Sequence, residues 1–136
     1  MDADSALADL TEISSQVEAA VIVDDAGAVV ASTLADAERS ARLARAAVDL
    51  LGAADKRFES GGRALTQLEA ALQEGSVFVA REAGRSIVAT TSAEPTSGLV
   101  FYDLKTCLRS LTDPKPARAK RRNTKTKVSE IKETGA

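Results

Sequence analysis

The chain has 136 residues, of which 44% are hydrophobic and 3% are aromatic, and its formal net charge at pH 7 is −2. It contains no His and a single Cys, which excludes the usual Ser-His-Asp and Cys-His catalytic arrangements and an internal disulfide. No apolar run approaches the roughly 20 residues of a membrane-spanning helix, and the acidic start MDADSALADL lacks the basic segment of a secretory signal. We therefore expect one cytoplasmic domain without a metal ion or other cofactor.

The charge is divided unevenly along the chain. Residues 1–112 carry ten Lys or Arg and seventeen Asp or Glu, a net charge of −7, whereas residues 113–136 carry eight and three, a net charge of +5. The second segment begins with Asp113-Pro114-Lys115-Pro116 and has too few apolar residues to fold alone. We expect a folded domain over residues 1–112 and a basic, disordered tail over residues 113–136.

The first predicted element is a helix over residues 4–17. Asp4 is a candidate N-cap, and the acidic residues that follow it are expected on the exposed face. The apolar residues recur at helical spacing; they are Leu7, Leu10, Ile13 and Val17.

A β-hairpin is predicted over residues 19–33, because two runs of β-branched residues flank the turn formers Asp24-Asp25-Ala26-Gly27. Asp24 and Asp25 could also serve as paired carboxylates for acid–base chemistry or for a metal ion. The turn is the better interpretation, since Gly27 completes the hairpin signal and the sequence offers no other ligand cluster.

A long helix is predicted over residues 34–58, ending before Gly61-Gly62. Thr33 followed by Asp36 resembles a capping box with Asp in place of Glu or Gln. The apolar sector is wide and rich in Ala, which suits packing against a sheet on one side and against another helix on the other. The remaining arc is polar and consists of Arg39, Arg42, Arg45 and Asp49. The glycines belong to no GxxxxGK[ST] or GxGxxG motif, so nucleotide binding by this chain is not expected.

Residues 63–75, RALTQLEAALQEG, fit both a helix and a strand. Ala, Leu, Gln and Glu favour a helix, and Leu65, Leu68 and Leu72 share one helical face. Leu68, Ala70 and Leu72 also alternate with their neighbours as they would in a half-buried strand. The residues alone leave both structures open.

A second hairpin is predicted over residues 76–92, with a turn at Glu82-Ala83-Gly84. After Pro95, a last helix is predicted over residues 97–111, for which Thr96 or Ser97 can serve as the cap. Its apolar face consists of Val100, Leu104, Cys107, Leu108 and Leu111, with Phe101 at the margin. We interpret Cys107 as a packed core thiol rather than a nucleophile, because it lies on this face and no His is available.

This order of elements resembles the roadblock/dynein-light-chain family. The matching segments are AAVIVDDAGAVVAST, GGRALTQLEAALQEGSVFVA, RSIVATTSAEPTSGLVFYDL and LRSL, which span about residues 5–111. The resemblance implies an α+β, roadblock/profilin-like fold with the order α-β-β-α-β-β-β-α. Its five-stranded antiparallel sheet is sandwiched between helices, the first and last on one face and the long helix on the other. It also implies that RALTQLEAAL is an edge strand, whose pairing overrides its helical propensity.

The resemblance further implies a homodimer in which the third strand pairs with its copy and the two long helices pack together. The residues expected at this interface are Leu65, Gln67, Leu68, Ala70, Leu72, Ala44, Ala47, Val48 and Leu51. Bacterial members of the family include regulators of small Ras-like GTPases, which face the paired long helices. Carried over to this chain, the GTPase contacts fall on the polar arc defined above, although such an arc can also be simply solvated. No catalytic residue and no arginine finger are assigned.

The leading functional hypothesis is a non-enzymatic homodimer that binds a small GTPase and regulates or scaffolds it. One alternative is association with nucleic acid, an anionic membrane surface or an acidic partner through the basic tail, by Lys120, Arg121, Arg122, Lys125 and Lys127. Another, within the same family, is a dynein-type cargo-adaptor light chain. A small-molecule sensor is disfavoured, because few aromatic residues and a core of small side chains leave little room for a ligand cavity.

Overall fold

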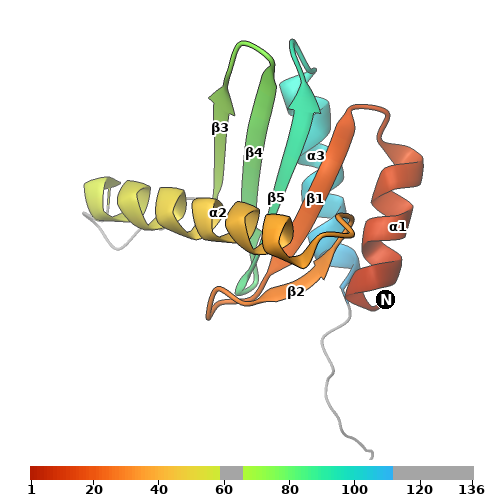
Figure 1. Cartoon of the computed structure of the whole chain (residues 1–136), viewed down its shortest axis with the longest axis horizontal. Helices are drawn as coiled ribbons and strands as arrows, with labels where there is room; N and C mark the ends of the chain where they lie inside the picture. The colour runs from red at the N-terminus through yellow and green to blue at the C-terminus, as the bar shows by residue number, and fades with distance from the viewer. Residues whose placement is uncertain (59–65, 112–136) are drawn as a thin grey trace, which may run out of the picture.

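The computed structural model describes residues 1–58 and 66–111. These residues form a five-stranded antiparallel sheet with helices on both faces (Figure 1). In chain order the elements are α1 (Ala3–Ile13), β1 (Val17–Val23), β2 (Val29–Ser32), α2 (Ala37–Phe58), β3 (Gln67–Ala71), β4 (Gly75–Glu82), β5 (Arg85–Ser92) and α3 (Ser97–Ser110). The strands are arranged in the order β2-β1-β5-β4-β3, so β2 and β3 are the two edges.

The helices lie in the two layers that were predicted. α1 and α3 cover one face of the sheet, and α2 crosses the strands on the other (Figure 1). The predicted fold class, element order and layering are therefore confirmed. No helix among the described residues is long and apolar enough to cross a membrane.

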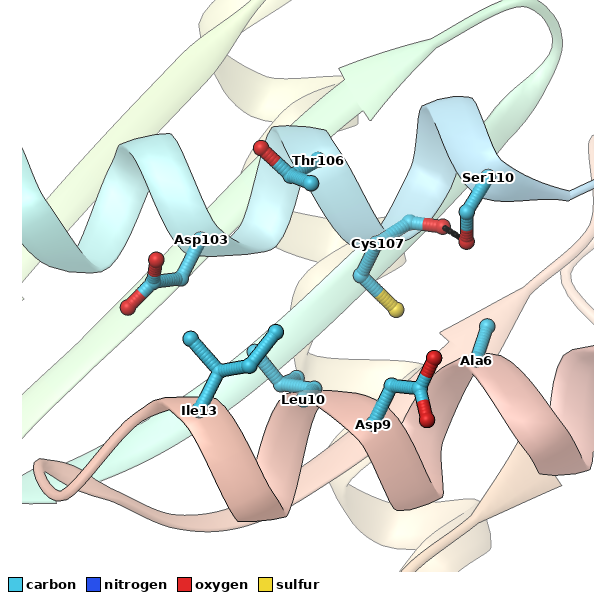
Figure 2. A pocket seen from close by; sticks show the side chains of 8 residues that line it. All are labelled: Ala6, Asp9, Leu10, Ile13, Asp103, Thr106, Cys107 and Ser110. Carbon is cyan, nitrogen blue, oxygen red and sulfur yellow. Dashed lines mark hydrogen bonds between the residues drawn. The ribbon is translucent and has the colours of Figure 1, made fainter.

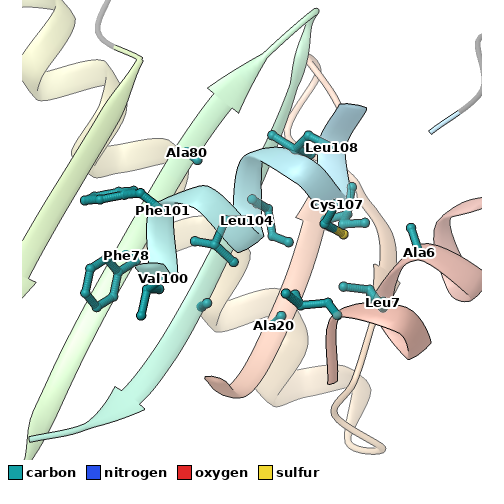
Figure 3. Close-up of a cluster of buried hydrophobic side chains, with 14 of the residues drawn as sticks. Ala6, Leu7, Ala20, Phe78, Ala80, Val100, Phe101, Leu104, Cys107 and Leu108 are labelled. Carbon is teal, nitrogen blue, oxygen red and sulfur yellow. The ribbon is translucent and has the colours of Figure 1, made fainter. Parts of the chain in front are cut away.

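The larger core cluster lies under α1 and α3 (Figure 3). Phe78 of β4 and Phe101 of α3 meet edge to face, with ring centroids 5.0 Å apart and ring planes at 75°. Leu10 of α1 and Leu104 of α3 are buried in the same cluster. The apolar stripe predicted for the last helix is thus the face by which α3 packs on the sheet.

A second cluster lies between the sheet and α2. Four valines of the central strands, Val21, Val23, Val79 and Val88, pack against the underside of the helix. The helix contributes mainly small side chains to this contact, which lets its backbone lie close to the strands. These residues are Ala44, Ala47 and Leu51, and all three are buried.

Both hairpins form where turn residues predicted them. Asp24 Oδ1 accepts hydrogen bonds of 2.9 Å from the amides of Ala26 and Ala28, and Gly27 has a φ of 88°. Ala83 and Gly84 have φ values of 56° and 78°, the left-handed pair that a type I′ hairpin turn requires. The carboxylate of Asp24 is thus occupied by its own turn, as the turn interpretation expected.

The first helix is shorter than predicted, and its cap is different. α1 ends at Ile13, and Val17 begins β1 instead of ending the helix. Asp2, not Asp4, is the N-cap, and its side chain accepts a hydrogen bond of 2.8 Å from the amide of Ser5. Ser14 ends the helix in an extended conformation, and its Oγ accepts bonds of 3.3 Å from the amides of Gln16 and Val17.

The predicted cap of the long helix is also wrong, whereas that of the last helix is at a predicted residue. The Thr33 hydroxyl accepts a bond of 2.9 Å from the amide of Ala20, so it joins β1 rather than a capping box. Asp36 instead accepts the amides of Glu38 and Arg39 at the start of α2. Thr96 occupies the cap position of α3, one of the two residues predicted for it, although its side chain makes no capping hydrogen bond.

The ambiguous stretch contains the edge strand β3, as the resemblance implied. Gly61-Gly62, residues 63–65 and the tail over 113–136 lie outside the described residues, so the predictions made for them are not addressed.

Gly75, the first residue of β4, gives a test of how closely the central strands approach. A Cβ at this position would lie 2.2 Å from the carbonyl oxygen of Thr91 in β5, so β4 and β5 would have to separate. We expect Gly75→Ala to lower the free energy of unfolding by about 1–3 kcal/mol, the usual cost of overpacking. The measurement is urea unfolding followed by circular dichroism.

Gly98→Ala in α3 is the matched control for Gly75→Ala. A Cβ at Gly98 meets nothing within 4 Å, so the control should keep wild-type stability or gain slightly. If Gly75→Ala were as stable as Gly98→Ala, the close approach of β4 and β5 would be wrong.

Candidate interaction surface

The outer edge of β3 has backbone groups directed away from the sheet. Arg81 N donates to Thr66 O at 2.8 Å, and Leu72 N donates to Gly75 O at 2.7 Å, which fixes the bonding pairs with β4. Because bonding alternates along an antiparallel ladder, the amides and carbonyls of residues 67, 69 and 71 point outward. Within the described residues no strand lies beyond β3, so these groups form an open edge.

The two faces of β3 are engaged differently. Leu68 packs against the cluster beneath α2. Glu69, on the opposite face, accepts a hydrogen bond of 2.9 Å from the hydroxyl of Ser97 at the start of α3. Leu72, just past the strand, keeps 62% of its surface exposed. The strand is therefore held by the protomer along one edge only and carries an exposed apolar residue at its end.

The structure divides the residues of α2 that were predicted for the dimer interface. Ala44, Ala47 and Leu51 are buried against the protomer's own sheet, so they have almost no surface to offer a partner. Val48 is 41% exposed, and Leu50, which was not predicted, is 38% exposed. The interface assignment itself stays a prediction, with Val48 and Leu50 as the exposed large apolar residues in the described part of the helix.

The polar arc of α2 is exposed along its whole length. Arg39 and Arg42 line a hollow of about 310 Å³ beside Leu43, whereas Arg45 lines another of about 400 Å³ beside Val48. The arginines thus border both flanks of the helix instead of one patch. None of the four arc side chains has a hydrogen bond or ion pair to another described residue, so their charges are available to a partner.

The structure offers little support for chemistry by the other candidate residues. No group of three or more Cys, Asp or Glu within residues 1–58 and 66–111 is arranged to hold a metal ion. Burial, with a smaller contribution from the charge of Asp9, raises the pKa of the Cys107 thiol to about 11. A thiol with such a pKa is a poor nucleophile near neutral pH, in line with the core interpretation.

One ion pair near this surface could not be predicted from local patterns. Arg81 of β4 donates two hydrogen bonds, of 2.9 and 2.8 Å, to the carboxylate of Asp55 in α2. The bond to Asp55 raises the pKa of Arg81. This bidentate pair fastens the C-terminal half of α2 to the strand next to the β3 edge. A charged residue directly after the buried run Phe78, Val79 and Ala80 of the strand is the signal that could have pointed to it.

The chain matches a known domain family and several solved structures. A family model of the Roadblock/LC7 domain matches residues 4–92. The crystal structure of a Roadblock/LC7 domain from Streptomyces avermitilis has a TM-score of 0.71 at 20% identity, and the match covers 81% of this chain and 94% of that chain. MglB of Myxococcus xanthus has a TM-score of 0.56 at 16% identity, and the match covers 77% of each chain.

A further solved structure, the gliding protein MglB from Thermus thermophilus, has a TM-score of 0.61 at 16% identity, and the match covers 75% of this chain and 82% of that chain. At these identities the solved structures show a shared fold. No curated protein sequence matches the chain.

Proposed function

Since the chain belongs to the Roadblock/LC7 domain family, we propose that it acts as a non-enzymatic homodimer that binds a small Ras-like GTPase and regulates or scaffolds it. The observation that carries this proposal is the combination of a β3 edge and an exposed arginine arc on α2, neither of which has a partner among residues 1–58 and 66–111. The first feature suits a second copy of the chain, and the second suits an acidic protein surface.

The dimer forms by antiparallel pairing of β3 with the same strand of a second copy. A two-fold axis makes this contact self-complementary, and the sheet then continues from one protomer into the next. An axis through Glu69 would place two carboxylates opposite each other, which is unfavourable. We therefore expect the axis to pass beside Leu68 or Ala70, so that small or apolar side chains face their own copies.

The GTPase binds the outer surface of the paired α2 helices. Its switch regions meet Arg39, Arg42, Arg45 and Asp49, which are exposed on this surface. The arc can steer an acidic partner and fix its orientation. No residue is assigned as an arginine finger; holding the GTPase's own catalytic residues in place accounts equally well for regulation.

Charge reversal on the arc tests the GTPase contact. We expect Arg42→Glu in the full-length protein to weaken binding of its GTPase by about tenfold or more, because attraction is replaced by repulsion. Candidate small GTPases from the same source would be screened by pull-down, and the affinity and GTP hydrolysis rate of any hit measured with both proteins. Lys105→Glu on α3 makes the same charge change on the opposite face and should leave binding unchanged.

This assignment would be contradicted if the wild-type protein recovered no GTPase, or if the GTPase bound wild type and Arg42→Glu with equal affinity. The dimer is tested separately, because its contacts lie on β3.

A further inference from the structure

A narrow groove separates α1 from α3 on the face of the sheet opposite α2 (Figure 2). It encloses about 70 Å³, with Leu10 and Ile13 on its α1 side and Cys107 on its α3 side. This volume suits the end of a long side chain and falls below the roughly 300–1,000 Å³ of small-molecule sites. The groove is therefore better suited to a protein segment than to a metabolite.

Asp103 is the unusual residue of this groove. It keeps only 8% of its surface exposed and lines the cavity, where its carboxylate is directed toward α1 (Figure 2). It has no hydrogen bond or ion pair to any residue that the structure describes. Burying a carboxylate without a partner is costly, and a cation in the groove would offset that cost.

Other acidic residues near Asp103 also favour a positively charged ligand in the groove. Asp9 lines the groove on the far side of Cys107, so carboxylates lie at both ends of an apolar centre (Figure 2). α1 also carries Asp4 and Glu12 and contains no Lys or Arg. Next to the buried centre, Ile13 is 68% exposed. The groove therefore fits a basic segment that also carries apolar side chains.

We propose that this groove binds the chain's own C-terminal segment, residues 117–132. Only residues 111–116 separate this segment from the end of α3, and Ser110, in the last turn of α3, lines the groove. Residues 113–136 carry a net charge of +5, which complements the net charge of −7 over residues 1–112. Val128 and Ile131 are their only large apolar residues.

The length of the segment allows this contact. Asp103 and Ser110 are seven residues apart on α3, roughly 10 Å along the helix axis. The sequence between Ser110 and the basic cluster at Lys120, Arg121 and Arg122 is long enough to turn back over that distance. Lys and Arg side chains then reach the two carboxylates, and Val128 and Ile131 cover Ile13. Because α2 lies on the other face, the tail can dock while α2 stays open to a partner.

Zero-length cross-linking of the full-length protein tests the contact directly. A carbodiimide joins Lys amines to carboxylates that touch them, so we expect tail lysines to be joined to Asp9 or Asp103, as read by mass spectrometry. Asp103→Asn should remove the Asp103 products and weaken the rest, whereas Asp25→Asn, in an exposed turn, should not. Mixing ¹⁵N-labelled and unlabelled chains distinguishes links within one chain from links between copies.

Alkylation of the single Cys107 gives an independent readout, because the thiol lies in the groove. We expect the charge-reversed tail Lys120→Glu/Arg121→Glu/Arg122→Glu, or 0.5 M salt, to speed alkylation by about threefold or more relative to wild type at low salt.

The proposal would be overturned by any of three results. These are tail-to-groove links that join only labelled to unlabelled chains, no tail-to-groove links at all, and an alkylation rate that does not depend on tail charge or salt. The proposal would also be overturned if the protein showed no tail-to-groove links and its tail bound duplex DNA or anionic vesicles instead.

Discussion

Ala71→Pro is expected to convert the proposed dimer into a folded monomer. The amide of residue 71 points away from β4, so proline at this position removes no hydrogen bond of the protomer. In a dimer paired through β3, the same substitution removes a backbone hydrogen-bond donor and places a proline ring at the contact. Because the dimer is two-fold symmetric, the contact loses this donor in both protomers. A loss of about 1–2 kcal/mol at each copy raises the dimer dissociation constant on the order of 100-fold.

Ala70→Pro is the matched control, because it makes the same chemical change one residue earlier. The amide of residue 70 points toward β4, so proline there breaks a bond within the protomer and should lower its free energy of unfolding. Sedimentation velocity over a range of concentrations gives the dimer dissociation constant, and urea unfolding gives the stability of each variant.

Two results would contradict the β3 interface. One is a wild-type protein that sediments as a monomer at every concentration. The other is an Ala71→Pro protein that dimerises as tightly as wild type, which would place the contact elsewhere. A GTPase that still binds the monomeric variant would separate the α2 contact from the dimer.

Local chemistry was enough to predict the hairpins and most of the core. Asp24 and Gly27 fix one turn, and Gly84 fixes the other, through hydrogen bonds and positive φ values that depend only on neighbouring residues. β3 is the opposite case. Its sequence, QLEAA, consists of good helix formers, and it becomes a strand by pairing with β4. Only the resemblance to a known family suggested that pairing.

The candidate surfaces show the same division. The helical periodicity of α2 placed its arginines on an exposed arc, but it could not show that Ala44 and Ala47 are used by the protomer's own sheet. Asp103 lies in α3 between exposed Tyr102 and buried Leu104, yet its burial depends on α1, which is distant in the chain. The periodicity of a helix in the sequence shows which residues share a face. Which helix or strand packs against that face is determined by the tertiary structure.

Phe78→Ala is expected to cause the largest loss of stability in the protomer. Phe78 is fully buried, lies opposite Glu69 of β3 in the sheet register, and packs against Phe101 of α3. Removing its ring leaves a cavity beneath α3, for which we expect a loss of about 3–5 kcal/mol in the free energy of unfolding. Since typical domains have only about 5–15 kcal/mol in total, the variant should be close to unfolding at 37 °C.

The comparison with exposed Tyr102 separates core packing from a general sensitivity of α3. Tyr102→Ala removes a ring of similar size from the residue that follows Phe101 in α3, where 66% of the residue is exposed, and should cost less than about 1 kcal/mol. Urea unfolding at one fixed protein concentration is required, because dimerisation would add to the apparent stability. A Phe78→Ala variant as stable as Tyr102→Ala would mean that the ring pair does not join α3 to β4. β4 pairs with the edge strand β3. Loss of this packing should therefore also weaken the proposed β3 contact between protomers, although Phe78 lies in the core and not at that contact.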